Sequence, residues 1–117
     1  MTNNSDFHKE LKTLMNQYVH LVYDYSSKFP KEELYGVTSQ FRRAALSVVL
    51  NYIEGYARQR KAHLKNFLEI AYGSLKECKY LCHFTYEREY ISKDEFEKLI
   101  RIADRIGAML WGILKKL

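Results

Sequence analysis

The spacing of apolar residues constrains this chain more than any other feature, because they recur at alternating steps of three and four along three long stretches. Such spacing places side chains on one face of an α-helix. The stretches are Phe7, Leu11, Leu14, Tyr18, Leu21 and Tyr25; Leu64, Leu68, Ala71, Leu75, Cys78, Cys82 and Thr85; and Phe96, Leu99, Ala103, Ile106, Leu110, Ile113 and Leu117. With an apolar segment between the first two, they predict helices at about 6–28, 38–60, 63–90 and 93–116. Four such helices with short links favour an all-α fold, an antiparallel up-down four-helix bundle.

The ends of these helices carry local signals. Pro30, the one proline in the chain, ends the first helix, and a short helical turn is expected at 31–35. Either Thr38 or Ser39 is expected to cap the second helix. The segment SKDE at 92–95 has the serine and glutamate of a capping box, so the fourth helix is expected to start there.

The length of 117 residues suits one domain, predicted over residues 1–117, that buries roughly two-thirds of its unfolded surface. The N-terminus MTNNSDFHKE lacks the charged and apolar regions of a leader, and the chain has only two cysteines. These features predict an intracellular, cytoplasmic protein with free thiols. No apolar run reaches the ~18 to 20 residues of a membrane span, so a membrane is not an expected partner.

The net charge of +5 comes from one part of the sequence. Residues 38–65 carry six Lys or Arg against Glu54 alone, whereas residues 1–37 sum to −1 and residues 66–117 to +1. Arg42 and Arg43 lie at one end of the second helix, roughly 25 Å from a cluster at its other end. That cluster consists of Arg58, Arg60, Lys61, His63 and Lys65. It predicts phosphate binding, with a solvated helix end as the alternative.

The second helix carries more apolar surface than a bundle requires. Its polar residues form a narrow stripe, and apolar residues cover roughly 240° of the circumference, against little more than 100° for an ordinary bundle helix. Either another subunit covers this helix or its own bundle encloses it unusually, and we favour a homo-oligomer. The chain's ten tyrosines suit such an interface, with the core of one domain as their alternative place. The expected interface residues are Phe41, Ala45, Val49, Tyr52, Ile53 and Tyr56.

Polar residues of the second and third helices predict a seam that fixes the register of the two helices. Its expected members are Ser47, Asn51, Glu54, Ser74 and Glu77. Glu54 is also four residues before Arg58, a spacing that allows an ion pair on one helix. A ligand site and a nucleic-acid contact are the two other interpretations of these residues.

Catalysis and metal binding are not expected. Cys78 and Cys82 lie one turn apart beside His83, but a structural zinc site needs four ligands, and both cysteines fall on an apolar face. None of the four histidines has the spacing to a serine or cysteine that marks nucleophilic catalysis. We therefore expect no enzyme activity, no catalytic residue, no metal and no cofactor.

The segment FPKEELYGVTSQFRRAALSVVLNYIEGYAR, followed by FLEIAYGSLKE, resembles the small bacterial four-helix bundle proteins encoded in intervening sequences of 23S ribosomal RNA genes. The chain departs from their pattern at VVLNYIEG and at Cys78, changes expected to alter packing rather than fold. The resemblance implies an up-down bundle that associates as a homopentamer. It also suggests kinship with accessory proteins of diversity-generating retroelements, which are basic bundles that bind nucleic acid and partner a reverse transcriptase. It implies no established enzymatic activity.

Two functions follow as hypotheses. The first is an oligomeric, non-catalytic accessory protein that binds RNA or DNA through a basic rim, mainly by phosphate contacts. The second is a structural or protein-interaction oligomer without a nucleic-acid role, for example an accessory subunit of a polymerase-type enzyme. The expected partners are thus other copies of the chain, with RNA, DNA or a reverse-transcriptase-like protein as candidates.

Overall fold

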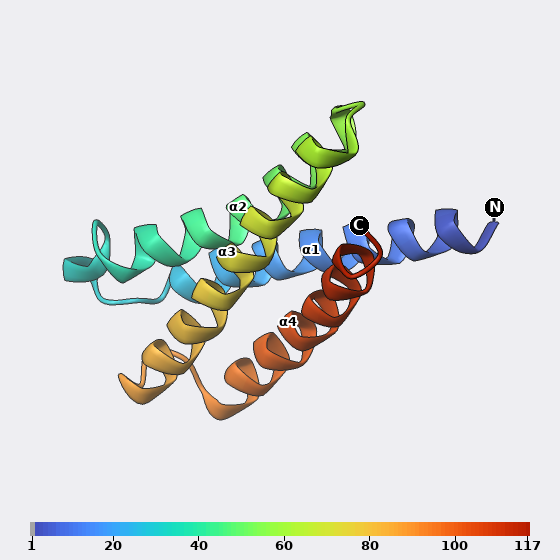
Figure 1. The fold of residues 1–117 in the computed structure, drawn as a ribbon. Coiled ribbons are helices and arrows are strands. Elements are labelled where there is room, and N and C mark those ends of the chain that lie inside the picture. Colours follow the sequence, from blue (N-terminus) through green and yellow to red (C-terminus); the bar gives the residue numbers. More distant parts are fainter. Residues whose placement is uncertain (1) are drawn as a thin grey trace.

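The computed structural model describes residues 2–117, which form four α-helices and one short 3-10 helix. The elements are α1 (Thr2–Ser26), η1 (Lys31–Glu33), α2 (Val37–Ala57), α3 (Lys61–Glu87) and α4 (Lys93–Leu114), shown in Figure 1. No strand is present within residues 2–117, so the predicted all-α class is confirmed. The domain predicted over residues 1–117 has its first residue outside this range. Each predicted helix is present, with ends that differ by up to about four residues.

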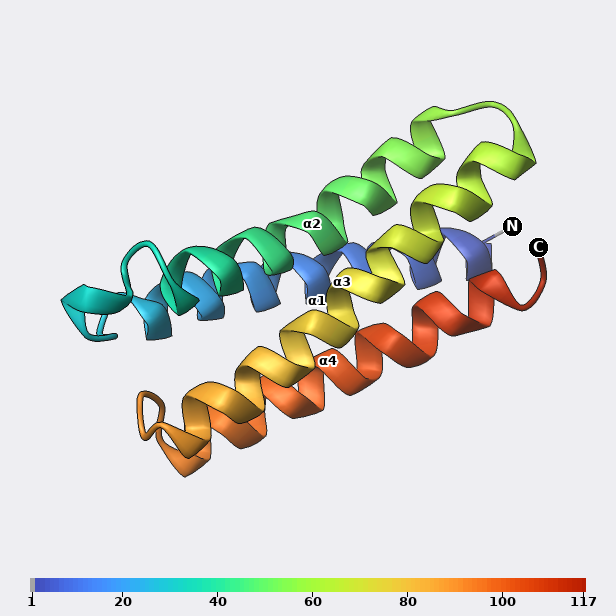
Figure 2. The ribbon, with the colours of Figure 1, turned by 60° about the vertical axis from the view of Figure 1, so that its left-hand side comes forward.

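The four helices lie side by side in a bundle that measures 44 × 25 × 19 Å. Helices α2 and α3 form the most extensive pair, and α4 packs on α1 and α3 while α1 also packs on α2. Figure 2 shows the start of α1 and the C-terminus at the same end of the bundle as the α2–α3 turn. We call this the termini end, and the opposite end, which holds η1 and the α3–α4 turn, the η1 end.

The start of α2 differs from the prediction that Thr38 or Ser39 caps it, and that prediction is wrong. The N-cap is Gly36, so Thr38 already lies inside the helix, where it is buried. Gly36 has no side chain to accept a hydrogen bond. Oε1 of Glu33 accepts one from the backbone N–H of Val37 at 3.2 Å instead. A carboxylate of η1 thus takes the place of the expected hydroxyl cap.

Two other predicted helix-end signals are confirmed. The 3-10 helix η1 lies within the short helical turn expected after Pro30. At the start of α4, the hydroxyl of Ser92 accepts a hydrogen bond from the backbone N–H of Glu95 at 3.1 Å. Oε1 of Glu95 accepts one from the backbone N–H of Ser92 at 2.9 Å, which completes the capping box.

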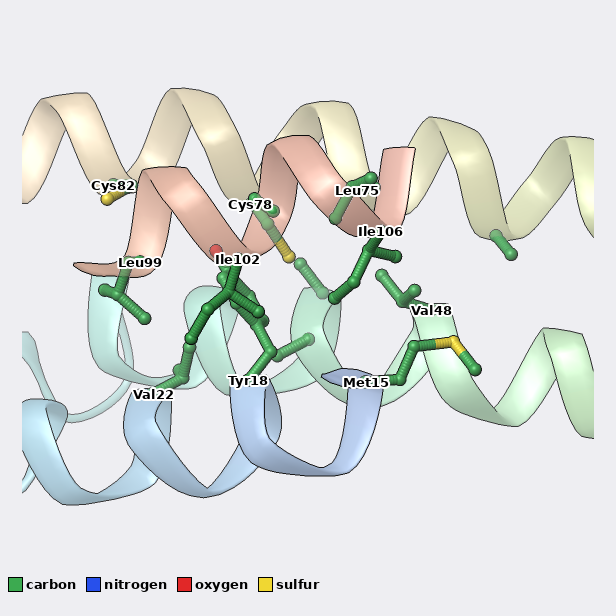
Figure 3. Packing of buried hydrophobic residues seen from close by; sticks show 14 of the residues in the cluster. Met15, Tyr18, Val22, Val48, Leu75, Cys78, Cys82, Leu99, Ile102 and Ile106 are labelled. Carbon is green, nitrogen blue, oxygen red and sulfur yellow. The ribbon is translucent and has the colours of Figure 1, made fainter. Parts of the chain in front are cut away.

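The core draws side chains from all four helices. Figure 3 shows Met15, Tyr18 and Val22 of α1 pointing toward residues of α3 and α4. Residues that are at most 1% exposed include Leu11, Tyr18, Phe41, Leu68, Leu75, Leu99, Ile106 and Leu110. Within residues 2–117, none of the helices combines the length and the apolar character required to cross a membrane.

Candidate nucleic-acid interface

The predicted basic cluster occupies the turn between α2 and α3. Arg58 and Arg60 have extended backbones, with φ/ψ of −86°/144° and −93°/131°, which end α2 at Ala57 and begin α3 at Lys61. We call the residues at this turn the turn cluster. All of its members are exposed: Arg58, Arg60, Lys61, His63 and Lys65.

Gly55 allows α2 and α3 to approach closely just before this turn. A Cβ atom at this position would lie 3.2 Å from Cδ1 of Leu64 and 3.2 Å from Cβ of Phe67. Gly55 is buried, and Leu64 and Phe67 are half-buried against it. The contact holds the first turn of α3 against the last turn of α2, so the turn cluster projects from a packed support.

Arg58 is the member of the turn cluster that pairs within the chain. Its Nη2 lies 2.6 Å from Oε2 of Glu54, so the ion pair expected from the spacing is present. Both side chains are about half exposed, which limits the contribution of this pair to roughly 1 kcal/mol or less. No other ion pair is found at this turn within residues 2–117. Arg60, Lys61 and Lys65 therefore present their full charge to solvent.

The termini end of the bundle holds most of the net charge. The half made of residues 2–14, 48–74 and 104–117 contains nine Lys or Arg and five Asp or Glu, which is +4 of the total +5. Sequence reasoning missed two of these cations, Lys115 and Lys116, because they lie far from the turn cluster along the chain. The signal that could have found them is the predicted topology, which returns the end of the fourth helix to the end of the second.

Arg42 and Arg43 lie near the η1 end, separated from the turn cluster by the length of α2. Nε of Arg42 donates a hydrogen bond to Oγ of Ser26 at 2.8 Å, and its guanidinium stacks on Tyr23 at 4.7 Å from the ring centroid. Arg43 is exposed and lines a groove of about 450 Å³ between α2 and α3. The structure therefore does not bring these two arginines and the turn cluster together within one chain.

Three of the five predicted seam residues form one hydrogen-bond network between α2 and α3. The hydroxyls of Ser47 and Ser74 are hydrogen bonded at 2.7 Å. Nδ2 of Asn51 donates to the carbonyl oxygen of Ser47 at 2.8 Å and to its hydroxyl at 3.0 Å. Glu54 instead pairs with Arg58, and Glu77 lines the 450 Å³ groove together with Ser47 and Ser74. Because the two hydroxyls and the amide nitrogen of Asn51 are hydrogen bonded between the helices, the network favours a packing role.

Three residues predicted at an oligomer interface lie in the core of their own chain. Phe41, Ala45 and Tyr52 are 1%, 1% and 3% exposed, so the interface prediction is wrong for them. The physical reason is that α1 and α3 pack on the two flanks of α2 and together cover much of its apolar arc. Enclosure within its own bundle thus accounts for part of this arc.

The outer face of α2 still carries exposed apolar side chains. Leu50 is 57% exposed, Ile53 is 53% exposed, and Val49 is half-buried beside them. We call these three residues the α2 outer patch. Tyr56, which was also predicted at the interface, faces α1, where its ring centroid lies 5.0 Å from that of His8.

Cys78 and Cys82 are free and buried on the core face of α3. Burial is the main cause that raises the pKa of each thiol to about 12. Within residues 2–117, no group of three or more His, Cys, Asp or Glu residues is placed to hold a metal ion. The two cysteines therefore behave as small apolar core residues.

We expect both thiols to resist a disulfide reagent such as DTNB in the folded protein near pH 8. The thiolate is the reactive form, and with a pKa of about 12 only about one thiol in ten thousand is ionised at this pH. Absorbance of the released chromophore should show two thiols per chain reacting promptly only after guanidinium unfolds the protein. Rapid reaction of either thiol before unfolding would contradict its burial.

Comparisons with known proteins agree with this architecture. The model of the family described as 23S rRNA-intervening sequence protein matches residues 9–112. A crystal structure of a protein of unknown function from the S23 ribosomal protein family of Bacteroides thetaiotaomicron is similar, with a TM-score of 0.85 and 21% sequence identity. The similarity covers 93% of this chain and 98% of that chain, and at this identity it shows a shared fold. A search of curated proteins gave no match.

Proposed function

We propose that this chain, which belongs to the 23S rRNA-intervening sequence protein family, is a non-catalytic accessory protein that binds RNA or DNA through the turn cluster. The observation that carries the proposal is the concentration of exposed cations at one tip, with Glu54 as their one ion-pairing carboxylate within residues 2–117. Such a surface contacts phosphates and reads little sequence.

The proposal includes assembly of antiparallel up-down bundles into a homo-oligomer through the α2 outer patch, with a pentamer as the form that the family resemblance suggests. Ile53 precedes Arg58 by five residues, about 7 to 8 Å along the helix axis. Contact between patches would therefore gather the turn clusters of neighbouring subunits into a basic rim. Phosphate affinity rises with the number of cations that a surface presents together.

The test is the binding of a labelled RNA, followed by fluorescence anisotropy over a range of salt concentrations. We expect affinity to fall steeply with salt, because each phosphate contact releases counterions. R58A/R60A/K61A should weaken binding and reduce the slope of log affinity against log salt by about two to three for each turn cluster in contact. No binding by the unaltered protein at low salt would overturn the proposal.

A matched control uses three exposed cations of the η1 half, in the variant K93A/K98A/R101A. It removes the same charge, so it lowers the general attraction for nucleic acid equally. We expect its salt slope to stay close to that of the unaltered protein. Equal losses in the two variants would mean that net charge, and not the turn cluster, determines binding.

A further inference from the structure

A hollow of about 510 Å³ lies at the termini end of the bundle. Three segments that are distant in the sequence form it: the start of α1, the end of α2, and the end of α4 with the residues after it. Its described lining residues are Phe7, His8, Tyr56, Gly112, Ile113, Lys115, Lys116 and Leu117. They combine aromatic and aliphatic side chains with two lysines and include no Asp or Glu. The volume of the hollow is typical of a small-ligand site.

The aromatic rings of this hollow are held in place by one another. The centroid of the His8 ring lies 5.5 Å from that of Phe7 and 5.0 Å from that of Tyr56, both edge to face. Behind them, Nδ1 of His8 is hydrogen bonded to the hydroxyl of the buried Tyr52. The Tyr56 ring lies 4.9 Å from that of Tyr52 and remains 41% exposed. An aromatic surface is therefore presented to the hollow by a rigid support.

Desolvation by burial, and then the charge of Lys12, lower the pKa of His8 from its ordinary value. Permanent charges at the hollow come from its two lysines, which are exposed. Arg58 follows Tyr56 by two residues, but its guanidinium pairs with Glu54 and lies over the ring of Phe67 in α3, 5.2 Å from the ring centroid. The cations that line the hollow are therefore Lys115 and Lys116.

We propose that this hollow binds an unpaired base of a single-stranded nucleic acid, with Tyr56 as the stacking ring and with Lys115 and Lys116 on the adjacent phosphates. The inference rests on the proposed function and adds the class of nucleic acid. An exposed aromatic ring beside cations suits single strands, because every base has a stacking face. In a duplex that face is covered by the neighbouring base pairs, so the hollow selects against duplex.

The test compares a labelled single-stranded oligo-dT with a dA·dT duplex of the same length, at one low salt concentration. We expect the unaltered protein to bind the single strand at least tenfold more tightly, the scale of one stacked base. Y56L keeps an apolar side chain but removes the ring, so single-strand affinity should fall about 5- to 100-fold while duplex affinity stays unchanged. Y56F keeps the ring and should bind as the unaltered protein does.

The control is Y80L, which removes a tyrosine that is 67% exposed on the η1 half of α3. It should bind both probes normally, and circular dichroism should show equal helix content in all variants. Equal binding of both probes with no effect of Y56L, or an equal loss in Y80L, would overturn this inference and leave the proposed function intact. If neither probe binds at low salt, the proposed function fails as well.

Discussion

The variant L50D/I53D is expected to have the mass of one chain, 14.0 kDa, at micromolar concentration, whereas the unaltered protein should have several times that mass. Leu50 and Ile53 are each more than half exposed in the single chain, so burying them against a second copy would remove apolar surface from water. Two carboxylates at these positions would have to be buried without partners, at a cost of several kcal/mol per contact. Sedimentation velocity or light scattering measures the mass directly.

A matched control places the same two charges elsewhere. Leu34 is 50% exposed in the segment between η1 and α2, and Trp111 is 54% exposed on α4. The variant L34D/W111D should therefore keep the mass of the assembly. Helix content should be unchanged in both variants, because all four side chains are at least half exposed. A single-chain mass for the unaltered protein, or dissociation caused only by the control, would rule out the α2 outer patch as the interface.

The sequence predicted the helical elements well because helix periodicity is a local signal, but it placed the buried face of α1 less accurately. The predicted face included Leu14 and Leu21, which are half-buried, whereas Met15 and Val22 are 1% exposed. Both pairs have helical spacing, and each buried residue directly follows the predicted one in the sequence. Only contact with α2 and α4 on the two sides of α1 determines which set is covered.

Helix caps show the same limit. The capping box at the start of α4 was predictable because both of its partners lie within four residues of each other. The start of α2 was not, because the group that accepts from its first N–H belongs to Glu33 in the preceding element. A hydroxyl residue near a helix start is a good cap candidate only if the backbone turns there, and this chain turns at Gly36.

The candidate site divides in a similar way. The turn cluster was predictable because its residues are contiguous in the sequence and charged residues favour solvent. The hollow was not, because it requires His8, Tyr56 and Lys116 to meet at one end of the bundle. Periodicity gives the length of each helix but not how far its ends extend past those of its neighbours. Tyr56, the proposed stacking ring, was for that reason assigned from sequence to an oligomer interface.

Shortening Leu75 of α3 should destabilise the fold more than any other substitution proposed for this chain. A double-mutant cycle with Gly107 of α4 tests the contact between the two helices. Leu75 is 1% exposed, and a Cβ atom on Gly107 would lie 3.2 Å from its Cδ2. L75A should lower the free energy of unfolding by about 2 to 5 kcal/mol, because it removes buried methyl groups and leaves a cavity. Urea denaturation at one fixed protein concentration measures this loss, since the stability of an assembly depends on concentration.

Whether G107A stabilises or destabilises the protein should depend on whether residue 75 is leucine or alanine. In the unaltered protein, G107A gains up to about 1 kcal/mol of helix propensity but pushes a methyl group against a fully packed leucine, so it should be neutral or destabilising. With Leu75 shortened to alanine, the opposing methyl group is absent, and the same change should stabilise by about 1 kcal/mol or more as it fills part of the cavity. Additive effects in the cycle would show that the two helices do not approach this closely at Gly107.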